Sequence, residues 1–401
     1  MKKWLGRWAR RLLIALVVFA LLVWAVIALA PGFGAAPRGE RLARMQASPQ
    51  WQGERFHNPQ PMWNNFNALE RGGPAFAPAP NPSDDSQKMV DDTAARLARP
   101  IGDGLRITWF GHSSSLIEID GVRVLADPIW STTATPLWIG VNRWFKPLVP
   151  LEALRDVDAV VISHDHYDHL DMPTIKAMRD WNTRFIVPLG VGAHLERWGI
   201  PASRITELDW WEEVDVKGLN IVATPARHAT GRINPRKDRV LWAGYALLGP
   251  EHRVWYSGDT GLHDSVREVG TRYGPFDATL IEVGQYSRQW PDWHIGPEQA
   301  VMANRWANGR TMIPVHWALF DLSPHGWNEP AERTLAAAQC QGVDVATPQP
   351  GVPWEPGEAT APWWPRNLPW QTAAEDPIVS TRDGNPANRY PLPACVARAT
   401  P

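Results

Sequence analysis

One short stretch, His164 to His169, constrains the fold and the chemistry of this chain more than any other. It has the sequence His-Asp-His-Tyr-Asp-His and follows an apolar run, Ala159 to Ile162, that is typical of a buried strand. A helix-like segment, Met172 to Met178, comes next, with Pro173 near its start, where proline is tolerated. The polar residues are therefore predicted to lie in a loop at the carboxyl end of a strand, the usual place for a site in an α/β protein.

The residue types in this loop are good ligands for divalent metals. Imidazole and carboxylate groups bind borderline divalent ions, zinc above all. In an extended turn, His164 and His166 can point the same way and bind one ion, while Asp168 and His169 can bind a second ion close by. A site for a single metal and a solvated polar loop are the alternatives. Unpaired histidines and aspartates rarely crowd so tightly after a buried strand, which argues against the polar loop.

Three more candidate ligands, His228, Asp259 and His316, each end a separate strand-like run later in the chain. A lone histidine after a strand is more often a satisfied core residue than a ligand, so each position is weak alone. Together they complete a set for two metals. One ion would be bound by His164, His166 and His228, the other by Asp168, His169 and His316, and Asp259 would bridge the two ions.

The order of these motifs, His-x-His-x-Asp-His followed by His, Gly-Asp-Thr and His, resembles the metallo-β-lactamase superfamily. Within it, Thr108-Trp-Phe-Gly-His-Ser, Ser257-Gly-Asp-Thr-Gly and Tyr273-Gly-Pro-Phe-Asp resemble the branch of N-acyl-phosphatidylethanolamine phospholipase D and its bacterial relatives. The resemblance covers roughly residues 50–347. It implies an α/β fold, a four-layer αβ/βα sandwich, with two Zn²⁺ ions, or Mn²⁺ or Fe²⁺ as alternatives. It also implies hydrolysis of a phosphodiester, for example in a phospholipid headgroup.

Candidate catalytic residues are Asp168 and His294. The resemblance implies that His294, which precedes Ile-Gly-Pro-Glu-Gln, is a proton donor or a phosphate contact; the alternative is a hydrogen bond at a helix start. Asp127 ends a strand-like run and is expected to orient a ligating histidine, with a strand-end cap as the alternative. His112 either lies near the site or is merely packed, and we favour the interpretation that it is packed. Three nearby basic residues are either phosphate contacts or surface charges: Arg227, Arg232 and Arg288.

The N-terminal region predicts a membrane anchor. The run from Leu12 to Ala30 contains no charged residue and is long enough to span a hydrocarbon core of about 30 Å. Five basic residues precede it, so the N-terminus is expected in the cytoplasm. A cleaved signal peptide is the alternative, but the run exceeds the usual apolar core of such peptides. We therefore expect a single-pass protein of a bacterial inner membrane, with its catalytic domain in the periplasm or outside.

Length and composition favour one catalytic domain with appendages. The chain has 401 residues, a formal net charge of −2 and 44% hydrophobic residues, which argues against global disorder and against a basic nucleic-acid surface. We divide it into a basic end plus anchor (1–36), a tether and irregular arm (37–100), a catalytic domain (101–347) and a tail rich in Pro and Trp (348–401). A disulfide between Cys340 and Cys395 would pin this tail to the domain.

These observations predict a membrane-anchored binuclear metal-dependent hydrolase, foremost a phosphodiesterase of phospholipase D type. Hydroxide held between the two metals would attack phosphorus in line with the leaving group. The expected partners are a phospholipid or another phosphodiester, and the membrane. A metal-dependent lactonase and a non-catalytic envelope protein are the alternatives, and the intact ligand set counts against the second of these.

Overall fold

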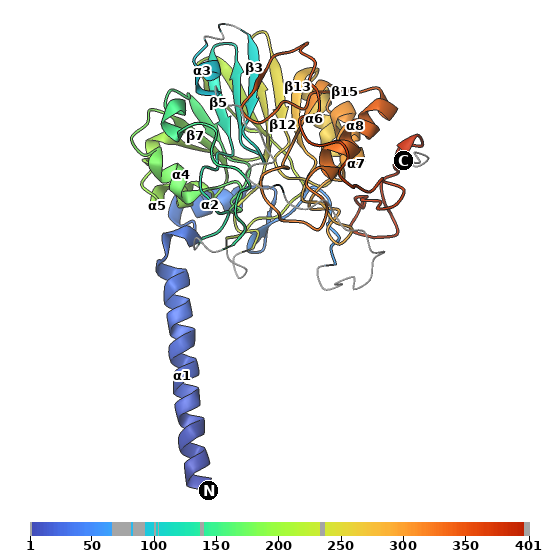
Figure 1. The fold of residues 1–401 in the computed structure, drawn as a ribbon. Coiled ribbons are helices and arrows are strands. Elements are labelled where there is room, and N and C mark those ends of the chain that lie inside the picture. The colour runs from blue at the N-terminus through green and yellow to red at the C-terminus, as the bar shows by residue number, and fades with distance from the viewer. Residues whose placement is uncertain are drawn as a thin grey trace.

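Two seven-stranded sheets form the centre of the molecule. The structure is a computed structural model that describes residues 2–65, 82, 93–99, 102, 104–136, 140–232 and 237–396. Helices α4 and α5 lie outside one sheet, and α6, α7 and α8 lie outside the other, which gives four layers (Figure 1). The predicted α/β architecture with two sheets is confirmed.

The first sheet comes from the N-terminal half of the domain, except for one strand from the tail. Its order is β16-β3-β4-β5-β6-β7-β8. β3, β4 and β5 are antiparallel neighbours, whereas β5 to β8 run parallel. The strands are β3 (Leu105–Trp109), β4 (Ser115–Ile119), β5 (Val122–Ala126), β6 (Ala159–Val161), β7 (Arg184–Pro188), β8 (Ile205–Leu208) and β16 (Pro353–Trp354).

The second sheet repeats this plan with the C-terminal half of the domain. Its order is β15-β14-β13-β12-β11-β10-β9, with antiparallel pairs from β9 to β12 and parallel pairs from β12 to β15. The strands are β9 (Glu213–Val216), β10 (Leu219–Thr224), β11 (Gly244–Leu248), β12 (Arg253–Tyr256), β13 (Phe276–Glu282), β14 (Gly309–Val315) and β15 (Asp344–Val345).

Strands that are apolar on both faces explain the layering. Successive side chains of a strand point to opposite faces. Ile117 and Val161 belong to the large core cluster that both sheets share. Their neighbours Leu116 and Val160 belong to the core cluster that includes residues of the outer helices, such as Ile175 of α4. Each central strand therefore packs on both sides, and polar side chains are left for the strand ends.

The helices of the domain are short and cover the outer faces of the sheets. α7 and α8 carry several buried residues each, and α6 begins just after the loop that holds Asp259. The helices are α3 (Thr93–Leu97), α4 (Met172–Ala177), α5 (Gly192–Arg197), α6 (Ser265–Tyr273), α7 (Pro297–Trp306) and α8 (Glu329–Gln341), with the 3₁₀ turns η2 (Leu151–Leu154) and η3 (Ala202–Arg204).

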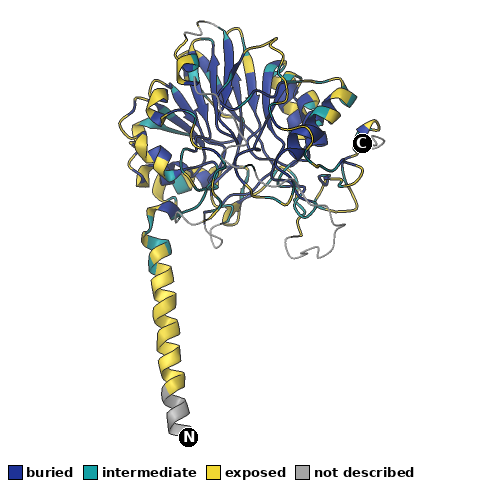
Figure 2. Cartoon of the chain, viewed as in Figure 1, coloured by how far each residue is buried: buried dark blue, intermediate teal, exposed yellow. Residues whose placement is uncertain are grey.

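The N-terminal helix α1 (Lys2–Leu29) stands away from the domain, and its described surface is largely exposed (Figures 1 and 2). The part from Trp8 to Leu29 is long and apolar enough to cross a membrane, a property that it shares with signal sequences. A short turn, η1 (Pro31–Phe33), then leads to the domain.

Part of the segment predicted as tether and irregular arm is regular structure. Residues Gly39–Ala47 form helix α2, and β1 (Trp51–Gln52) pairs with β2 (Arg55–Phe56). Arg41 fixes α2 to the domain, because its Nη1 lies 2.7 Å from Glu196 Oε2 and its Nε lies 2.9 Å from Glu207 Oε2. Most of residues 66–92, the remainder of the predicted arm, lie outside the described residues.

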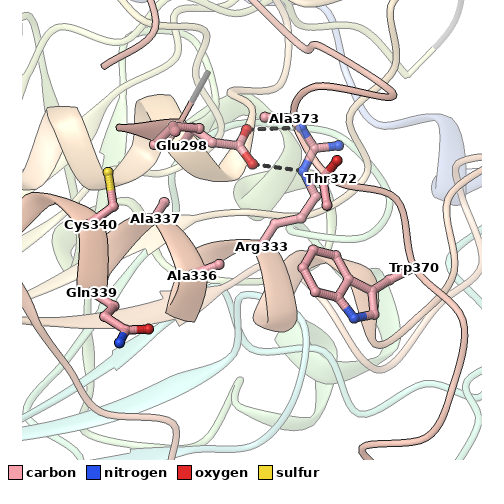
Figure 3. Close-up of a pocket in the computed structure, with 10 residues that line it drawn as sticks. Glu298, Arg333, Ala336, Ala337, Gln339, Cys340, Trp370, Thr372 and Ala373 are labelled. Atoms are coloured by element: carbon pink, nitrogen blue, oxygen red, sulfur yellow. Dashed lines mark hydrogen bonds and ion pairs between the residues drawn. The ribbon is translucent and has the colours of Figure 1, made fainter. Parts of the chain in front are cut away.

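The C-terminal tail is built into the domain. Its strand β16 pairs with β3, and Trp354 and Trp364 are buried. A disulfide joins Cys340 of α8 to Cys395. Between α7, α8 and the tail lies a cavity of about 400 Å³, with the Glu298–Arg333 ion pair at its wall (Figure 3).

Candidate metal centre

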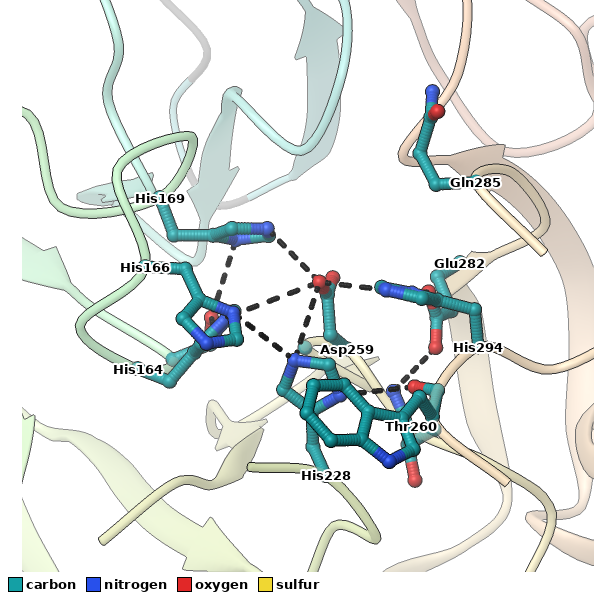
Figure 4. A network of polar contacts seen from close by, with 12 residues as sticks. His164, His166, His169, His228, Asp259, Thr260, Glu282, Gln285 and His294 are labelled. Carbon is teal, nitrogen blue, oxygen red and sulfur yellow. Dashed lines mark hydrogen bonds and ion pairs between the residues drawn. The ribbon is translucent and has the colours of Figure 1, made fainter. Parts of the chain in front are cut away.

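The predicted ligands meet at the edge where parallel strands of both sheets end. The loop from His164 to His169 follows β6, and Asp259 follows β12. His228 comes after β10, and His316 is the residue directly after β14. Figure 4 shows several of these side chains turned toward Asp259. Because each strand is buried, its polar end residues are placed at this one edge.

The first histidine group consists of His164, His166 and His228, as the sequence predicted. His166 Nδ1 lies 2.8 Å from His164 Nε2 and 3.3 Å from His228 Nε2, so three ring nitrogens converge. Burial lowers the pKa of His166 to about 4 and lowers the pKa of His164 and His228 well below the usual value. The three rings are therefore neutral at pH 7, which is the form that binds a metal.

The second group contains the predicted Asp168, His169 and His316 and one more residue, His112. His112 Nε2 lies 2.8 Å from Asp168 Oδ2, and the His112 and His316 ring centroids are 4.0 Å apart. The interpretation of His112 as packed rather than part of the site is therefore wrong: it is fully buried, yet its ring reaches a candidate ligand. The left-handed turn at Gly111 and His112 (φ 99° and 50°) aims it there.

Asp259 lies between the two groups. Its Oδ2 is 3.1 Å from His169 Nε2 and 3.8 Å from both His164 Nε2 and His228 Nε2, while its Oδ1 is 3.1 Å from His316 Nδ1. One carboxylate therefore contacts members of both groups (Figure 4). This is the arrangement that a bridging ligand requires.

Unpaired buried atoms show that the cluster fits cations. Among the described residues, four buried atoms of the cluster have no hydrogen-bond partner: His112 Nδ1, His169 Nε2, His316 Nε2 and Asp259 Oδ1. Burial raises the pKa of Asp259 to about 7, although His169 opposes that shift. Buried polar groups without partners are costly, and a divalent cation would compensate them. The donor set of imidazoles and carboxylates suits zinc and similar ions.

Asp127 contacts His169 of the second group on the side of the ring that faces away from Asp259. Its Oδ2 lies 2.7 Å from His169 Nδ1 and accepts hydrogen bonds from the hydroxyls of Ser163 and Tyr256, and its Oδ1 accepts from the Ser163 backbone N–H. With Nδ1 engaged by Asp127, Nε2 is the ring atom of His169 left to bind a metal, and it lies 3.1 Å from Asp259 Oδ2. The geometry is that of the predicted orienting carboxylate.

His294 lies at the rim of the cluster and is held by a buried carboxylate. Its Nδ1 is 2.8 Å from Glu282 Oε2 and 3.8 Å from Asp259 Oδ2, and its ring centroid is 5.1 Å from that of His228. Burial lowers the pKa of His294, although Asp259 and Asp168 oppose this shift. The imidazole is therefore close enough to both groups to contact a substrate bound between them.

The three basic residues considered as phosphate contacts have other partners. Arg227 is buried and contacts Asp292 and Thr381. Arg232 is buried and donates to backbone carbonyls, as described below. Arg288 pairs with Asp376. None of these contacts involves the side chain of a candidate metal ligand. Arg227 and Arg232 are buried and so are not surface charges.

Sequence reasoning missed several residues that support the ligands. Glu282 ends β13 next to β14 and is fully buried, while the Trp293 carbonyl accepts from His228 Nδ1 at 2.9 Å. Ser113 Oγ lies 3.0 Å from His316 Nδ1. The acidic end of an otherwise apolar strand was the one available signal for Glu282. The other contacts depend on backbone placement that no sequence motif reports.

Comparison with known proteins agrees with the geometry. The family described as Beta-lactamase superfamily domain matches residues 122–317. An uncharacterized protein of Mycobacterium tuberculosis is 47% identical over 68% of this chain and 78% of its own length. The N-acyl-phosphatidylethanolamine-hydrolyzing phospholipase D 1 of Caenorhabditis elegans is 34% identical over 55% of this chain and 65% of its own length.

Solved structures show the same fold. The isothiocyanate hydrolase from Delia radicum gut bacteria is 18% identical and covers 62% of this chain and 98% of its own, with a TM-score of 0.50. Family, relatives and the buried histidine and aspartate groups agree. The chain therefore belongs to the metallo-β-lactamase superfamily, as a metal-dependent hydrolase.

Proposed function

We propose that this protein is a membrane-anchored phosphodiesterase of phospholipase D type with a binuclear metal site. The position of Asp259 carries the proposal, because its carboxylate contacts His169 and His316 of one ligand group and faces His164 and His228 of the other. One ion would be held by the first histidine group and the other by Asp168, His169 and His316.

Two divalent ions, Zn²⁺ or alternatively Mn²⁺ or Fe²⁺, would supply an activated water nucleophile and neutralise charge in the transition state. The chain itself fixes the ligands. Asp127 orients His169, and the Trp293 carbonyl orients His228 through its Nδ1. His112 holds Asp168 by a contact of 2.8 Å, so that the carboxylate is positioned on the open side of the cluster.

His294 would bind the phosphate or transfer a proton to the leaving oxygen. Its Nδ1 lies 2.8 Å from Glu282 Oε2, and this contact fixes the orientation of the ring. His294, His166 and Asp168 are only partly buried, in contrast to the other ligands. A substrate would therefore approach the site from the side on which these three residues lie.

A phosphodiester substrate is supported by the relative from Caenorhabditis elegans, which is named for hydrolysis of N-acyl-phosphatidylethanolamine. Helix α1 supports a lipid substrate further, because it would anchor the domain beside a bilayer. With basic residues before the span, the domain would lie on the periplasmic or outer side of a bacterial inner membrane. The catalytic domain would cover residues 101–347, with the tail attached.

The test is a set of assays on the full chain in detergent. We would measure metal content, and then hydrolysis of bis-p-nitrophenyl phosphate, phosphatidylethanolamine and a soluble lactone. The site variant is His166→Ala, and the matched control is His57→Ala, which alters an exposed histidine outside the cluster. We expect about two metals per chain and phosphodiester cleavage that only His166→Ala abolishes.

Other outcomes separate the alternatives. Cleavage of the lactone alone, with metal bound, would replace the phosphodiesterase by a lactonase. Bound metal without turnover of any of the three substrates would favour a non-catalytic envelope protein. Absence of bound metal would contradict the site itself.

A further inference from the structure

The segment that follows α1 is fastened to the domain rather than hanging from it. We call residues 30–37 the exit segment. Arg197 of α5 donates to the carbonyls of Leu29 and Gly34, at 2.9 and 2.5 Å, and Trp198 Nε1 donates to the Pro31 carbonyl at 2.8 Å. The Ala35 backbone N–H donates to His194 Nδ1 at 2.8 Å. These bonds fix the direction in which α1 leaves the domain.

One buried guanidinium joins the exit segment to the metal-binding loop. Arg232 Nε donates to the Gly32 carbonyl at 2.9 Å. Its Nη1 donates to the carbonyls of Asp165 and Leu170, at 2.9 and 2.8 Å, which lie on either side of the ligands His166 to His169. Because all three acceptors are backbone groups, the anchor end and the metal-binding loop behave as one rigid unit.

A cavity of about 250 Å³ lies between the same two segments. Gly32 lines it on the exit-segment side, and Tyr167 and Leu170 line it on the side of the metal-binding loop. Tyr167 is next to the partly exposed ligands His166 and Asp168. The remaining wall combines four hydroxyl residues with apolar and acidic ones: Ser131, Thr132, Thr133, Thr135, Pro136, Met172, Pro173 and Asp171. The hydroxyl groups of this wall can hydrogen-bond polar lipid headgroups.

We infer that this face of the domain, with the exit segment, the cavity and the open rim of the metal centre, lies against the headgroup layer of the membrane that α1 spans. The inference rests on the proposed function and names the substrate source: phospholipids of the leaflet on the domain's own side. Figure 1 shows that α1 leaves from the lower edge of the sandwich, below the strands. The bonds of the exit segment prevent the domain from turning that edge away.

Fluorescence quenching by a headgroup-labelled lipid tests the orientation. The full chain would be reconstituted into phosphatidylcholine–phosphatidylethanolamine vesicles with a thiol fluorophore on Thr132→Cys or on Lys217→Cys. Thr132 is exposed beside the cavity, whereas Lys217 is exposed in the turn before β10, at the opposite end of the strand that leads to His228. The native cysteines are joined in a disulfide. We expect several-fold stronger quenching at residue 132 than at residue 217.

Two glycine variants show whether the exit segment causes the orientation. A Cβ on Gly34 (φ +71°) would lie 2.1 Å from His194 Nδ1, so Gly34→Ala must displace the segment. Gly39→Ala is the matched control, because Gly39 also has a positive φ (+58°) but no atom within 4 Å of its Cβ. We expect Gly34→Ala to remove the quenching difference and Gly39→Ala to keep it.

Equal quenching at both labelled positions in the otherwise unchanged chain, or an unchanged difference in Gly34→Ala, would overturn the inference. Hydrolysis of bis-p-nitrophenyl phosphate in detergent is measured on the same samples. A retained rate in Gly34→Ala shows that the metal centre is folded. If no sample hydrolyses this substrate while the quenching difference persists, the phosphodiesterase proposal fails and the orientation stands.

Discussion

Two buried polar clusters of this domain differ in how their groups are paired. Under the tail, Arg333 contacts both carboxylate oxygens of Glu298, at 2.8 and 2.9 Å (Figure 3). Nearby, the Tyr286 hydroxyl donates to Glu329 at 2.8 Å. At the metal centre, by contrast, imidazoles face imidazoles and Asp259 Oδ1 lacks a hydrogen-bond partner among the described residues (Figure 4). The first cluster is complete as it stands, whereas the second is completed by cations.

This difference separates a structural polar cluster from a functional one. A buried ion pair with matched partners holds two segments in register, here α7 and α8. A buried cluster of unmatched groups costs stability and persists where chemistry uses it. The two clusters should therefore respond in opposite ways when a carboxylate is removed from each.

The largest effect is expected from Asp259→Asn. Loss of the carboxylate between the two ligand groups should lower kcat/KM for bis-p-nitrophenyl phosphate by more than about 100-fold, beyond the usual loss for an outer-shell residue. The free energy of unfolding of the metal-free chain should change little, because burial raises the pKa of Asp259 to about 7 and the neutral side chain that Asn imitates is already populated there. Steady-state kinetics and urea unfolding of the chelator-treated protein measure the two quantities. A clear loss of stability with retained activity would show that Asp259 belongs to a structural polar cluster and not to a functional one.

Glu298→Ala should show the opposite pattern. It removes the two short contacts of Arg333 and leaves this buried charge with the longer contact to Glu329 Oε1 at 3.4 Å. Breaking a buried ion pair typically costs about 3–5 kcal/mol of unfolding free energy. The kcat/KM of the remaining folded enzyme should be unchanged. The double variant Glu298→Leu with Arg333→Met is the control. It should be more stable than Glu298→Ala because the buried guanidinium is removed together with Glu298, while Glu329 keeps its hydrogen bonds from the Tyr286 hydroxyl and the Gln371 backbone N–H. Urea unfolding gives the free energy of unfolding of each variant. An equal loss of stability in both would show that the broken ion pair is not the cause of the loss.

A smaller effect is expected from Asp127→Asn. This variant tests whether a residue that contacts a ligating histidine, without binding the metal itself, affects metal binding. Loss of the negative charge behind His169, and of one of the two acceptor oxygens, should weaken metal affinity by about 10–100-fold. Asp120→Asn is the matched control, because Asp120 also contacts a histidine, His252 at 2.6 Å, but lies outside the site. Competition with a chelating dye gives both affinities. A similar loss in the two variants would show that Asp127 acts through general stability alone.

The smallest effect is expected from Tyr256→Phe, which removes one donor to Asp127. A hydrogen bond to a charged group contributes about 1.5–3 kcal/mol, and Asp127 keeps its bonds from Ser163, so the loss in metal affinity should be below that of Asp127→Asn. Tyr245→Phe is the control, because the Tyr245 hydroxyl donates to the Ile162 carbonyl instead. An equal change in metal affinity for both tyrosine variants would remove Tyr256 from the site.

The fold and the candidate ligands were largely predictable because they follow local rules. The run predicted from Ala159 to Ile162 is β6, Ala159–Val161, and each candidate ligand follows a strand as its apolar pattern indicated. A parallel arrangement then brings the strand ends together. Local pattern and family resemblance therefore agreed on the two sheets and on the residues that meet at their edge.

Contacts between distant segments could not be predicted. Arg41 and Glu207 are 166 positions apart, and nothing in the sequence near Gly39 shows that α2 packs on the domain. His112 enters the site because a left-handed turn aims its ring at Asp168. Arg232 looked like a candidate phosphate contact, yet its guanidinium donates to three backbone carbonyls, which no side-chain pattern reveals.

The central claim is that Asp259 lies between two bound metals. Anomalous X-ray diffraction at the zinc absorption edge, on crystals grown with zinc, tests it most directly. We predict two peaks about 3.5–4 Å apart on either side of the Asp259 carboxylate, one among His164, His166 and His228 and one among Asp168, His169 and His316. A single peak, or peaks away from Asp259, would contradict the binuclear site.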